Sequence, residues 1–376
     1  ISLISVPYNS LIISYERMDA FAYISVFESI AKLGIVYSLL LLNNVDRLIV
    51  YAILICILQI AVRITYGWFC RKNFSVTYSH MGFDKYLTKQ MAVFIGWKIN
   101  GDLAFVGCGQ GLNIVLNMFF GPIVNAARGI SVQVQNITNT FIQSYQMALQ
   151  PQIIKSYAGG NLSYMRRLVI ICSKYGFYLM LMVAFPILNY TESILNLWLV
   201  HIPEDTVFLV RIILLICFIT PLRQPLIQSI NATGNIKRFQ IIEGTILLMA
   251  VPVAYIGLKY FHFSLFAVMA SYLCIEYIAQ IARVWMVLPY IEFPYREYFK
   301  AILYPIGKVI IVLTAIHFFI RSFFSNTNWE IFCGLCLSEL LCITTCFSIG
   351  INSTERQQIR LFITNRIKQC KNRNIP

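Results

Sequence analysis

Residues 168–188 read LVIICSKYGFYLMLMVAFPIL, and residues 206–220 read TVFLVRIILLICFIT after a short polar break. A helix of about 20 apolar residues crosses a hydrocarbon core of ~30 Å, and its internal hydrogen bonds satisfy the backbone groups that lipid cannot satisfy. Because similar runs follow one another along the whole chain, the sequence predicts an all-α polytopic membrane protein.

The other apolar runs extend this pattern. We expect ten complete transmembrane helices, at 20–42, 48–70, 91–119, 122–149, 168–188, 206–230, 239–258, 263–288, 298–320 and 331–350. The apolar run at 1–14 is too short to span a bilayer alone. We therefore expect it to be the second half of a further helix that begins upstream of Ile1.

Composition agrees with a membrane protein. Apolar residues make up 58% of the chain and charged residues 12%, and the mean hydropathy is +0.69, whereas soluble domains carry about 25% charged residues. In a soluble protein the net charge of +14 would suggest a nucleic-acid surface. Here most of the basic residues lie in the breaks between apolar runs, so we expect no nucleic-acid partner.

The basic residues also predict the orientation, because lysine and arginine concentrate in cytoplasmic breaks. Eighteen of them fall in one alternating set of breaks, including six in the tail at 351–376, whereas the other set holds only Arg47, Lys259 and Arg321. The tail is therefore predicted to be cytoplasmic and the break at 189–205 external. Basic residues in the tail can also contact anionic membrane lipids.

Fourteen charged residues remain inside the expected helices, where an ionised group costs at least ~2.5–3.5 kcal/mol. Nine are basic and five are acidic: Lys32, Arg63, Lys98, Arg128, Lys174, Arg211, Arg223, Arg283 and Lys308, with Glu28, Asp102, Glu243, Glu276 and Glu339. Most of them should face protein or water. A lumen between these helices should therefore be net basic.

Several of these charges have a local explanation. Glu28 and Lys32 are spaced i,i+4, as are Lys98 and Asp102, so each couple can form an ion pair on one helix. Together with Arg63, we treat Glu28, Lys32 and Asp102 as candidates for ion pairing or ion coupling. Three other residues lie within two turns of a predicted helix end and are expected to extend to the membrane interface: Lys174, Arg211 and Arg283.

Two arginines favour a cavity. Arg223 lies between Pro221 and Pro225, which remove backbone donors, break the helix and free carbonyls that are tolerated only beside protein or water. Arg128 lies six residues after Pro122, roughly 9 Å along a helix, which is deep for an interfacial side chain. A buried structural ion pair remains the alternative for both.

Neither a metal site nor an enzyme active site is predicted. Cys333 and Cys336 form a single CxxC pair without the second pair or the histidines that a zinc site needs. No loop combines a nucleophile with a base. We therefore expect no metal, no cofactor and no enzymatic activity.

Residues 121–130 read GPIVNAARGI, followed by Gln133 and Gln135, and residues 150–161 read QPQIIKSYAGGN. Together with QSINATGNIKR at 228–238, this chain resembles the Wzx-type lipid-linked oligosaccharide flippases of the multidrug/oligosaccharidyl-lipid/polysaccharide exporter superfamily. The stretches within 121–161 are more specific to this family than the stretch at 228–238.

The resemblance implies a MATE-like fold of two six-helix lobes around a central cavity. It assigns the chain to the back half of the N-terminal lobe without its first three helices (1–70), a cytoplasmic linker (71–90), a complete C-terminal lobe (91–288), two additional helices (289–350) and the tail (351–376). Relatives often carry ion-coupling residues in the three helices that this alignment lacks, so the coupling ion is not predicted.

The resemblance also implies a substrate, a polyprenyl pyrophosphate that carries an oligosaccharide for O-antigen or another surface polysaccharide and crosses the bacterial inner membrane. Fixed arginine and lysine side chains can replace the hydration shell of a pyrophosphate, arginine in a bidentate manner. We therefore expect Arg128, Arg223 and Lys98 to line the cavity and bind the pyrophosphate. The implied partners are this lipid, membrane lipids, a glycan polymerase and a chain-length regulator.

Two other function classes are alternatives. An exporter of a drug or of another lipid could share the fold, but cationic drugs require an acidic cavity, and the expected helices carry more bases than acids. A membrane enzyme acting on the same lipid-linked glycan would need catalytic residues on an external loop. The longest external break, 189–205, contains Glu192, Glu204 and Asp205 but no arginine.

Overall fold

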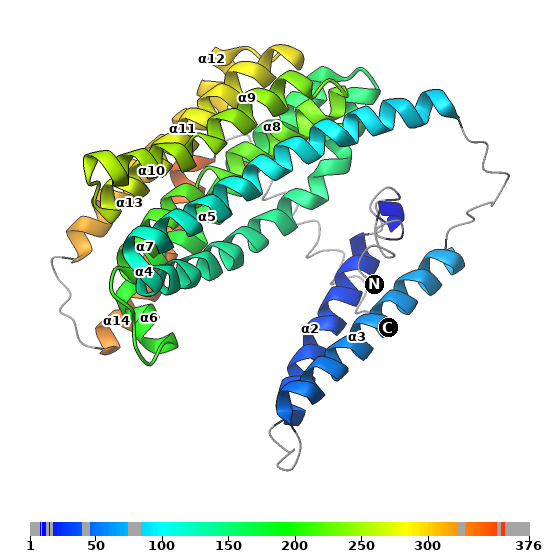
Figure 1. The fold of residues 1–376 in the computed structure, drawn as a ribbon. Coiled ribbons are helices and arrows are strands. Elements are labelled where there is room, and N and C mark those ends of the chain that lie inside the picture. The colour runs from blue at the N-terminus through cyan, green and yellow to red at the C-terminus, as the bar shows by residue number, and fades with distance from the viewer. Residues whose placement is uncertain are drawn as a thin grey trace, which may run out of the picture. The chain divides into compact units, whose positions relative to one another are not determined.

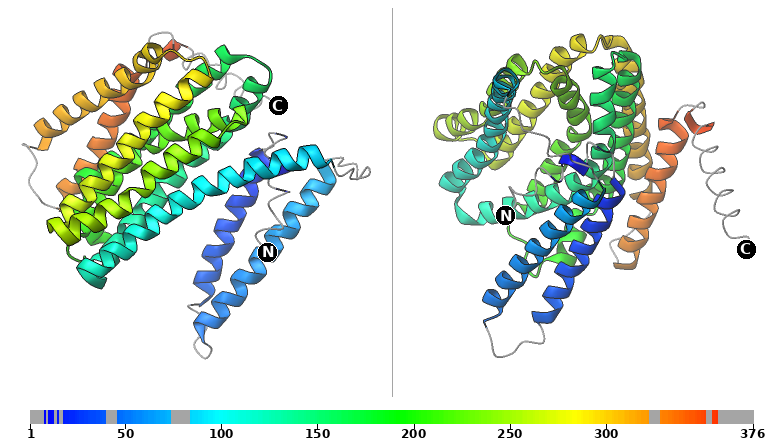
Figure 2. Two further views of the ribbon diagram at one scale, coloured as in Figure 1. Left: turned by 45° about the horizontal axis from the view of Figure 1, so that its top comes forward. Right: turned by 90° about the vertical axis from the view of Figure 1, so that its right-hand side faces the viewer.

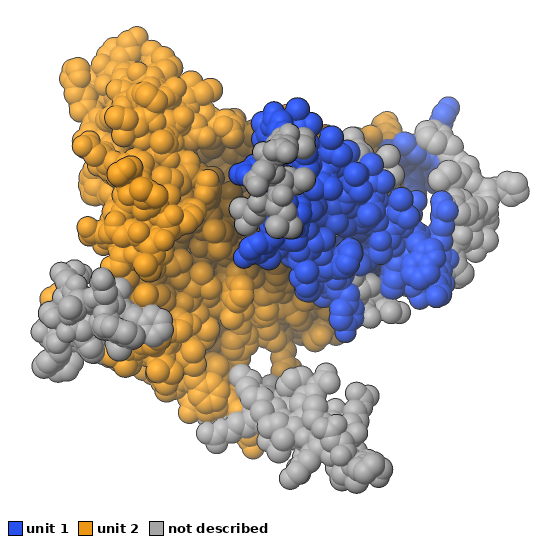
Figure 3. Space-filling view, turned by 90° about the horizontal axis from the view of Figure 1, so that it is seen from below, with its two compact units in different colours: residues 1–88 blue, residues 89–376 orange. Residues whose placement is uncertain are grey.

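The computed structural model describes residues 8, 10–12, 15, 18–39, 46–73, 84–321, 328–351 and 355–357. Every regular element in these ranges is a helix (Figure 1). The chain divides into two compact units, Ile1–Thr88 and Lys89–Pro376, which Figure 3 colours separately.

The first unit contains two helices that pack against each other, α2 (Met18–Ser38) and α3 (Arg47–Asn73). Its buried apolar residues lie mainly along one face of α3, at the i, i+4 spacing that aligns side chains on a helix: Leu58, Val62, Tyr66 and Cys70. Much of the rest of α3 is exposed in this unit, as expected for a helix that faces lipid.

The second unit begins with most of α4 (Lys85–Ala158), which is interrupted at Gly121. Gly121 has φ 79° and ψ −172°, a backbone conformation that residues with a Cβ avoid, and Pro122 follows it. Figure 1 and the left view of Figure 2 show the chain reversing direction in this helix. The two segments correspond to the predicted helices at 91–119 and 122–149.

Next come α5 (Leu162–Asn189), α6 (Thr191–Trp198), α7 (Thr206–Cys217) and α8 (Thr220–Thr233). The predicted helix at 206–230 is therefore broken between Cys217 and Thr220, immediately before Pro221. This interruption agrees with the break expected at Pro221, whereas α8 continues through Pro225. Helix α8 packs against α5 and α11.

The remaining elements complete the second unit. They are α9 (Lys237–Leu248), α10 (Ala250–Phe261), α11 (Leu265–Tyr290), α12 (Tyr295–Tyr298), the π-helix η2 (Phe299–Leu303), α13 (Tyr304–Arg321), α14 (Asn328–Thr345) and the π-helix η3 (Cys346–Gly350). Helix α11 packs against α9 and α10, and α14 packs against α5 and α13.

Within the described ranges, seven helices are long and apolar enough to cross a membrane: Arg47–Asn73, Lys85–Ala158, Leu162–Asn189, Thr206–Thr233, Lys237–Phe261, Leu265–Tyr290 and Tyr295–Phe318. The all-helical class with several membrane-spanning helices agrees with the prediction. The predicted count of ten crossings and the MATE-like layout are not confirmed. Part of the difference arises because the kinked α4 covers two predicted crossings and because the apolar helix Gly334–Gly350 is shorter.

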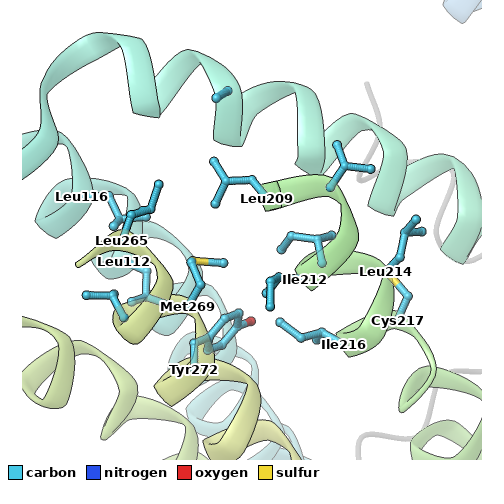
Figure 4. Close-up of a cluster of buried hydrophobic side chains, with 14 of the residues drawn as sticks. Leu112, Leu116, Leu209, Ile212, Leu214, Ile216, Cys217, Leu265, Met269 and Tyr272 are labelled. Carbon is cyan, nitrogen blue, oxygen red and sulfur yellow. The ribbon is translucent and has the colours of Figure 1, made fainter. Parts of the chain in front are cut away.

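A hydrophobic cluster holds the second unit together around the two segments of α4. Figure 4 shows Leu112 and Leu116 of α4 beside Leu209 and Ile212 of α7 and Met269 of α11. A second cluster joins α5, α8, α11, η2 and α13. Both clusters give the polar residues described below a rigid support.

Three predicted segments fall largely outside the described residues. They are most of the half-helix at 1–14, half of the linker at 71–90 and most of the basic tail at 351–376.

Candidate functional site

A cavity in the second unit, here called the main cavity, has a volume of about 510 Å³, within the ~300–1,000 Å³ of typical small-molecule sites. It lies between both segments of α4 and helices α8 and α9. Its lining comprises Lys98, Gly101, Asp102, Phe105, Gln135, Asn136, Asn139, Thr140, Gln143, Arg223, Gln224, Ile227, Gln228, Asn231, Gln240, Glu243 and Leu247.

Most of this lining is polar but uncharged, and eight of its residues carry amide side chains. On the second segment of α4 the polar residues follow helical spacing and form one stripe: Gln135, Asn139, Gln143, Gln146 and Gln150. Gly101 permits a close approach from α9, because a Cβ at that position would overlap the Gln240 side chain. Each helix that lines the cavity packs its apolar face against neighbouring helices, and its amide side chains face the cavity.

A smaller pocket of about 210 Å³, here called the glutamine pocket, continues from the main cavity. The two share three lining residues, Gln143, Gln224 and Gln228, and the rest of the pocket is lined by Gln146, Met147, Gln150, Ile153, Cys172 and Pro225. None of the described residues that line the glutamine pocket is charged.

The prolines of α8 explain one contact of the glutamine pocket. Pro225 has no N–H, so the carbonyl of Pro221 loses its partner one helical turn later. Gln146 of α4 replaces that partner, since its Nε2 donates to the Pro221 oxygen at 3.0 Å. The side chain of Gln150 donates to that of Gln228 at 2.8 Å and forms a second link between α4 and α8.

Arg223 lies in the wall of the main cavity with its guanidinium 5.1 Å from the centre of the Phe105 ring. This is a cation–π distance. Among the described residues, no carboxylate lies within ion-pair distance of Arg223. Its charge therefore faces the cavity without a counterion from the described part of the protein.

Lys98 lines the same cavity but is already paired. Its Nζ lies 2.6 Å from Asp102, and the two side chains are 36% and 62% exposed. The local ion pair expected from their i,i+4 spacing is therefore present. The structure brings Lys98, Asp102 and Arg223 into one cavity, and the Lys98 charge is partly balanced there.

Arg128 is not part of the lining of this cavity. It is 4% exposed, donates through Nε to the side chain of Asn113 on the other segment of α4, and lies 3.7 Å from the sulfur of Met269. Arg128 precedes Gln135 by seven residues, which places both on one face of the helix about 10 Å apart. It has no carboxylate partner within the described ranges, so its binding role stays a prediction.

Two charges expected at the membrane interface are instead buried, so this expectation was wrong for Lys174 and Arg283. Lys174 is 1% exposed and lies 2.7 Å from Glu355. Arg283 is fully buried and donates to Glu243 at 2.6 Å. Both have a carboxylate partner within the protein, and a buried cation needs such a partner because an uncompensated buried charge is strongly destabilising. Arg211 is exposed, in agreement with the expectation.

Arg283 belongs to a buried cluster that joins α9 and α11. Its Nη1 donates to Gln280 at 3.2 Å, and its Nη2 lies 3.8 Å from Glu276, which is too long for a hydrogen bond. Tyr272 donates to Glu276 at 3.3 Å. We call Glu243, Glu276, Gln280 and Arg283 the buried cluster. Sequence reasoning missed it because Glu243 and Arg283 are 40 residues apart.

In the first unit, Glu28 forms the predicted ion pair with Lys32 at 2.7 Å. Gln59 of α3 donates to Glu28 at 3.0 Å and accepts from Arg63 at 3.2 Å. These contacts join α2 to α3. A coupling role for Glu28, Lys32, Arg63 and Asp102 stays a prediction.

Within the described residues, no three metal-binding side chains form a cluster. The amide stripe is visible in the sequence once helical spacing is applied to polar residues as well as apolar ones.

No family model matches the chain, and no curated protein or solved structure shows significant similarity to it.

Proposed function

We propose that this protein is a membrane transporter of the Wzx type, which moves a polyprenyl-pyrophosphate-linked oligosaccharide across the bacterial inner membrane. One observation carries the proposal. The cavity between α4, α8 and α9 presents Arg223, a cation without a carboxylate partner in the described structure, beside a wall of amide side chains.

The chemistry of this wall favours an anionic substrate over a cationic drug. Two of the cavity's lining residues are acidic, Asp102 and Glu243, and each already pairs with a base. A cationic drug would have to break one of these ion pairs. A phosphate can bind Arg223 through two charge-assisted hydrogen bonds without breaking any.

Binding of polyprenyl pyrophosphate without sugar to the purified protein in lipid nanodiscs tests the proposal. Because Arg223 is assigned to the phosphate, Arg223→Ala should weaken binding about a hundredfold, and Arg223→Lys should weaken it less. Equal affinity in the wild-type protein and Arg223→Ala would contradict the assignment. Arg211→Ala removes an exposed arginine outside the cavity and serves as the matched control.

The proposed orientation places the tail after Ile351 in the cytoplasm and the 189–205 break outside. It rests on the eighteen-to-three distribution of basic residues between the two sets of breaks. Single cysteines at Asn196 and Gln369, in a background without other cysteines, can be labelled in intact cells. Labelling of Gln369→Cys with Asn196→Cys protected would show that the orientation is the reverse of the one proposed.

A further inference from the structure

The glutamine pocket contains a hydrogen-bonding acceptor whose orientation is fixed. Gln146 is 7% exposed, and its Nε2 must face the Pro221 carbonyl because a carbonyl can only accept. Its Oε1 therefore points the other way. This oxygen is buried and accepts no hydrogen bond from any described residue.

Two further amide oxygens of the same wall share this property. Asn139 on α4 and Asn231 on α8 are among the residues that line the main cavity, and the Oδ1 atom of each is buried without a hydrogen-bond donor among the described residues. Buried acceptors are rarely left without a donor. Three of them around connected cavities therefore indicate a ligand that supplies several O–H or N–H donors.

The absence of charge in the described lining of the glutamine pocket defines the ligand further. An anion would meet amide oxygens there with no cation to balance it, and a cation would meet no carboxylate. An apolar ligand would leave the amides unsatisfied. A neutral polyhydroxylated group meets all these conditions, because each hydroxyl donates one hydrogen bond and accepts others.

We propose that the glutamine pocket, together with Asn139 and Asn231 of the adjoining main cavity, is a carbohydrate-binding subsite for the first sugars of the transported lipid. The inference rests on the proposed function and deepens it. Arg223 then binds the pyrophosphate in the main cavity while Gln143 and Gln224, which line both spaces, contact the adjoining sugar ring.

The variant that tests this subsite is the double substitution Gln143→Leu with Gln224→Leu. Neither side chain forms a hydrogen bond with a described residue, so their replacement removes cavity donors and acceptors without breaking an internal contact. Gln133→Leu is the matched control, because Gln133 is exposed on the same helix and lines neither space. Thermal unfolding of each variant in detergent verifies that folding is unchanged.

Three probes are needed: polyprenyl pyrophosphate, the same lipid carrying one N-acetylglucosamine, and free triacetylchitotriose. We expect the wild-type protein and Gln133→Leu to bind the sugar-bearing lipid about tenfold more tightly than the bare lipid, the contribution of one or two neutral hydrogen bonds. The double variant should bind both lipids with the bare-lipid affinity.

The outcomes separate this inference from the proposed function. A tenfold preference that survives in the double variant, or no preference in the wild-type protein, overturns the subsite while lipid binding upholds the transport proposal. Binding of triacetylchitotriose alone, lost in the double variant, upholds the subsite and contradicts the transport proposal. If the wild-type protein binds none of the probes, both are wrong.

Discussion

Arg283 and Arg223 have the same side chain in neighbouring parts of one helical unit, but their surroundings differ. Arg283 is fully buried and is surrounded by Glu243, Glu276 and Gln280. Arg223 faces a cavity and lies against the ring of Phe105. No carboxylate among the described residues lies within ion-pair distance of it. A charge balanced inside the protein stabilises the fold, whereas an unbalanced charge on a cavity is available to a ligand.

The largest expected effect tests the structural half of this comparison. Arg283→Met should reduce folding stability by about 3–5 kcal/mol, because it leaves two buried carboxylates without their cation. Membrane abundance and thermal unfolding in detergent measure this change. Adding Glu243→Gln and Glu276→Gln should restore much of the lost abundance, since no uncompensated charge then remains. A single Arg283→Met variant with wild-type abundance would show that the buried cluster does not stabilise the fold.

Arg223 should show the opposite behaviour. Under the proposed function, Arg223→Ala should leave abundance unchanged and reduce delivery of surface glycan about a hundredfold, the contribution of two charge-assisted hydrogen bonds to the proposed phosphate. Arg223→Lys should keep part of the activity because the charge remains. Glycan and abundance are measured together in cells. If glycan falls only in proportion to the abundance of the protein, Arg223 stabilises the fold, as Arg283 does, and does not bind the substrate.

Gln146 tests the boundary between the two roles, because it both supports α8 and faces the glutamine pocket. Gln146→Leu removes the donor to the Pro221 carbonyl and leaves a buried acceptor unsatisfied, so stability should fall by about 1–3 kcal/mol. Thermal unfolding measures this, with Gln133→Leu as the control that should have no effect. An unchanged unfolding temperature in Gln146→Leu would mean that α8 does not depend on this contact.

The smallest effect is expected at Lys98. Its ion pair with Asp102 is largely exposed, so Lys98→Gln should change stability by less than about 0.5 kcal/mol. Its effect on glycan delivery should be smaller than that of Arg223→Ala, because Asp102 already balances part of its charge. A stronger defect in Lys98→Gln than in Arg223→Ala would show that Lys98, and not Arg223, makes the main contact with the proposed phosphate.

The sequence was sufficient for the features that depend on local chemistry. Long apolar runs predict membrane-spanning helices, Pro221 predicts the break before α8, and the boundary between the predicted helices at 91–119 and 122–149 coincides with the interruption of α4. Each follows from backbone geometry within a few residues. The i,i+4 pairs follow from helical spacing for the same reason.

Features that depend on packing between distant helices were not predictable in this way. The position of Arg283 near a predicted helix end indicated an exposed side chain, because nothing near it in sequence identified Glu243 as its partner. Arg128 was grouped with Arg223 on depth alone, yet it lies outside the lining of the main cavity. The spacing of the amide stripe is visible in the sequence, but only the packing of α4 against α8 and α9 shows that the stripe faces a cavity.

The ion pair between Lys174 and Glu355 has a consequence for biosynthesis. The two residues are 181 positions apart, and the carboxylate lies five residues after the end of η3. At about 5–20 residues per second, Lys174 is synthesised roughly 10–40 s before Glu355. During that interval the nascent bundle holds a cation whose final counterion does not yet exist, so closure of the interior around α5 must be a late, post-insertion event.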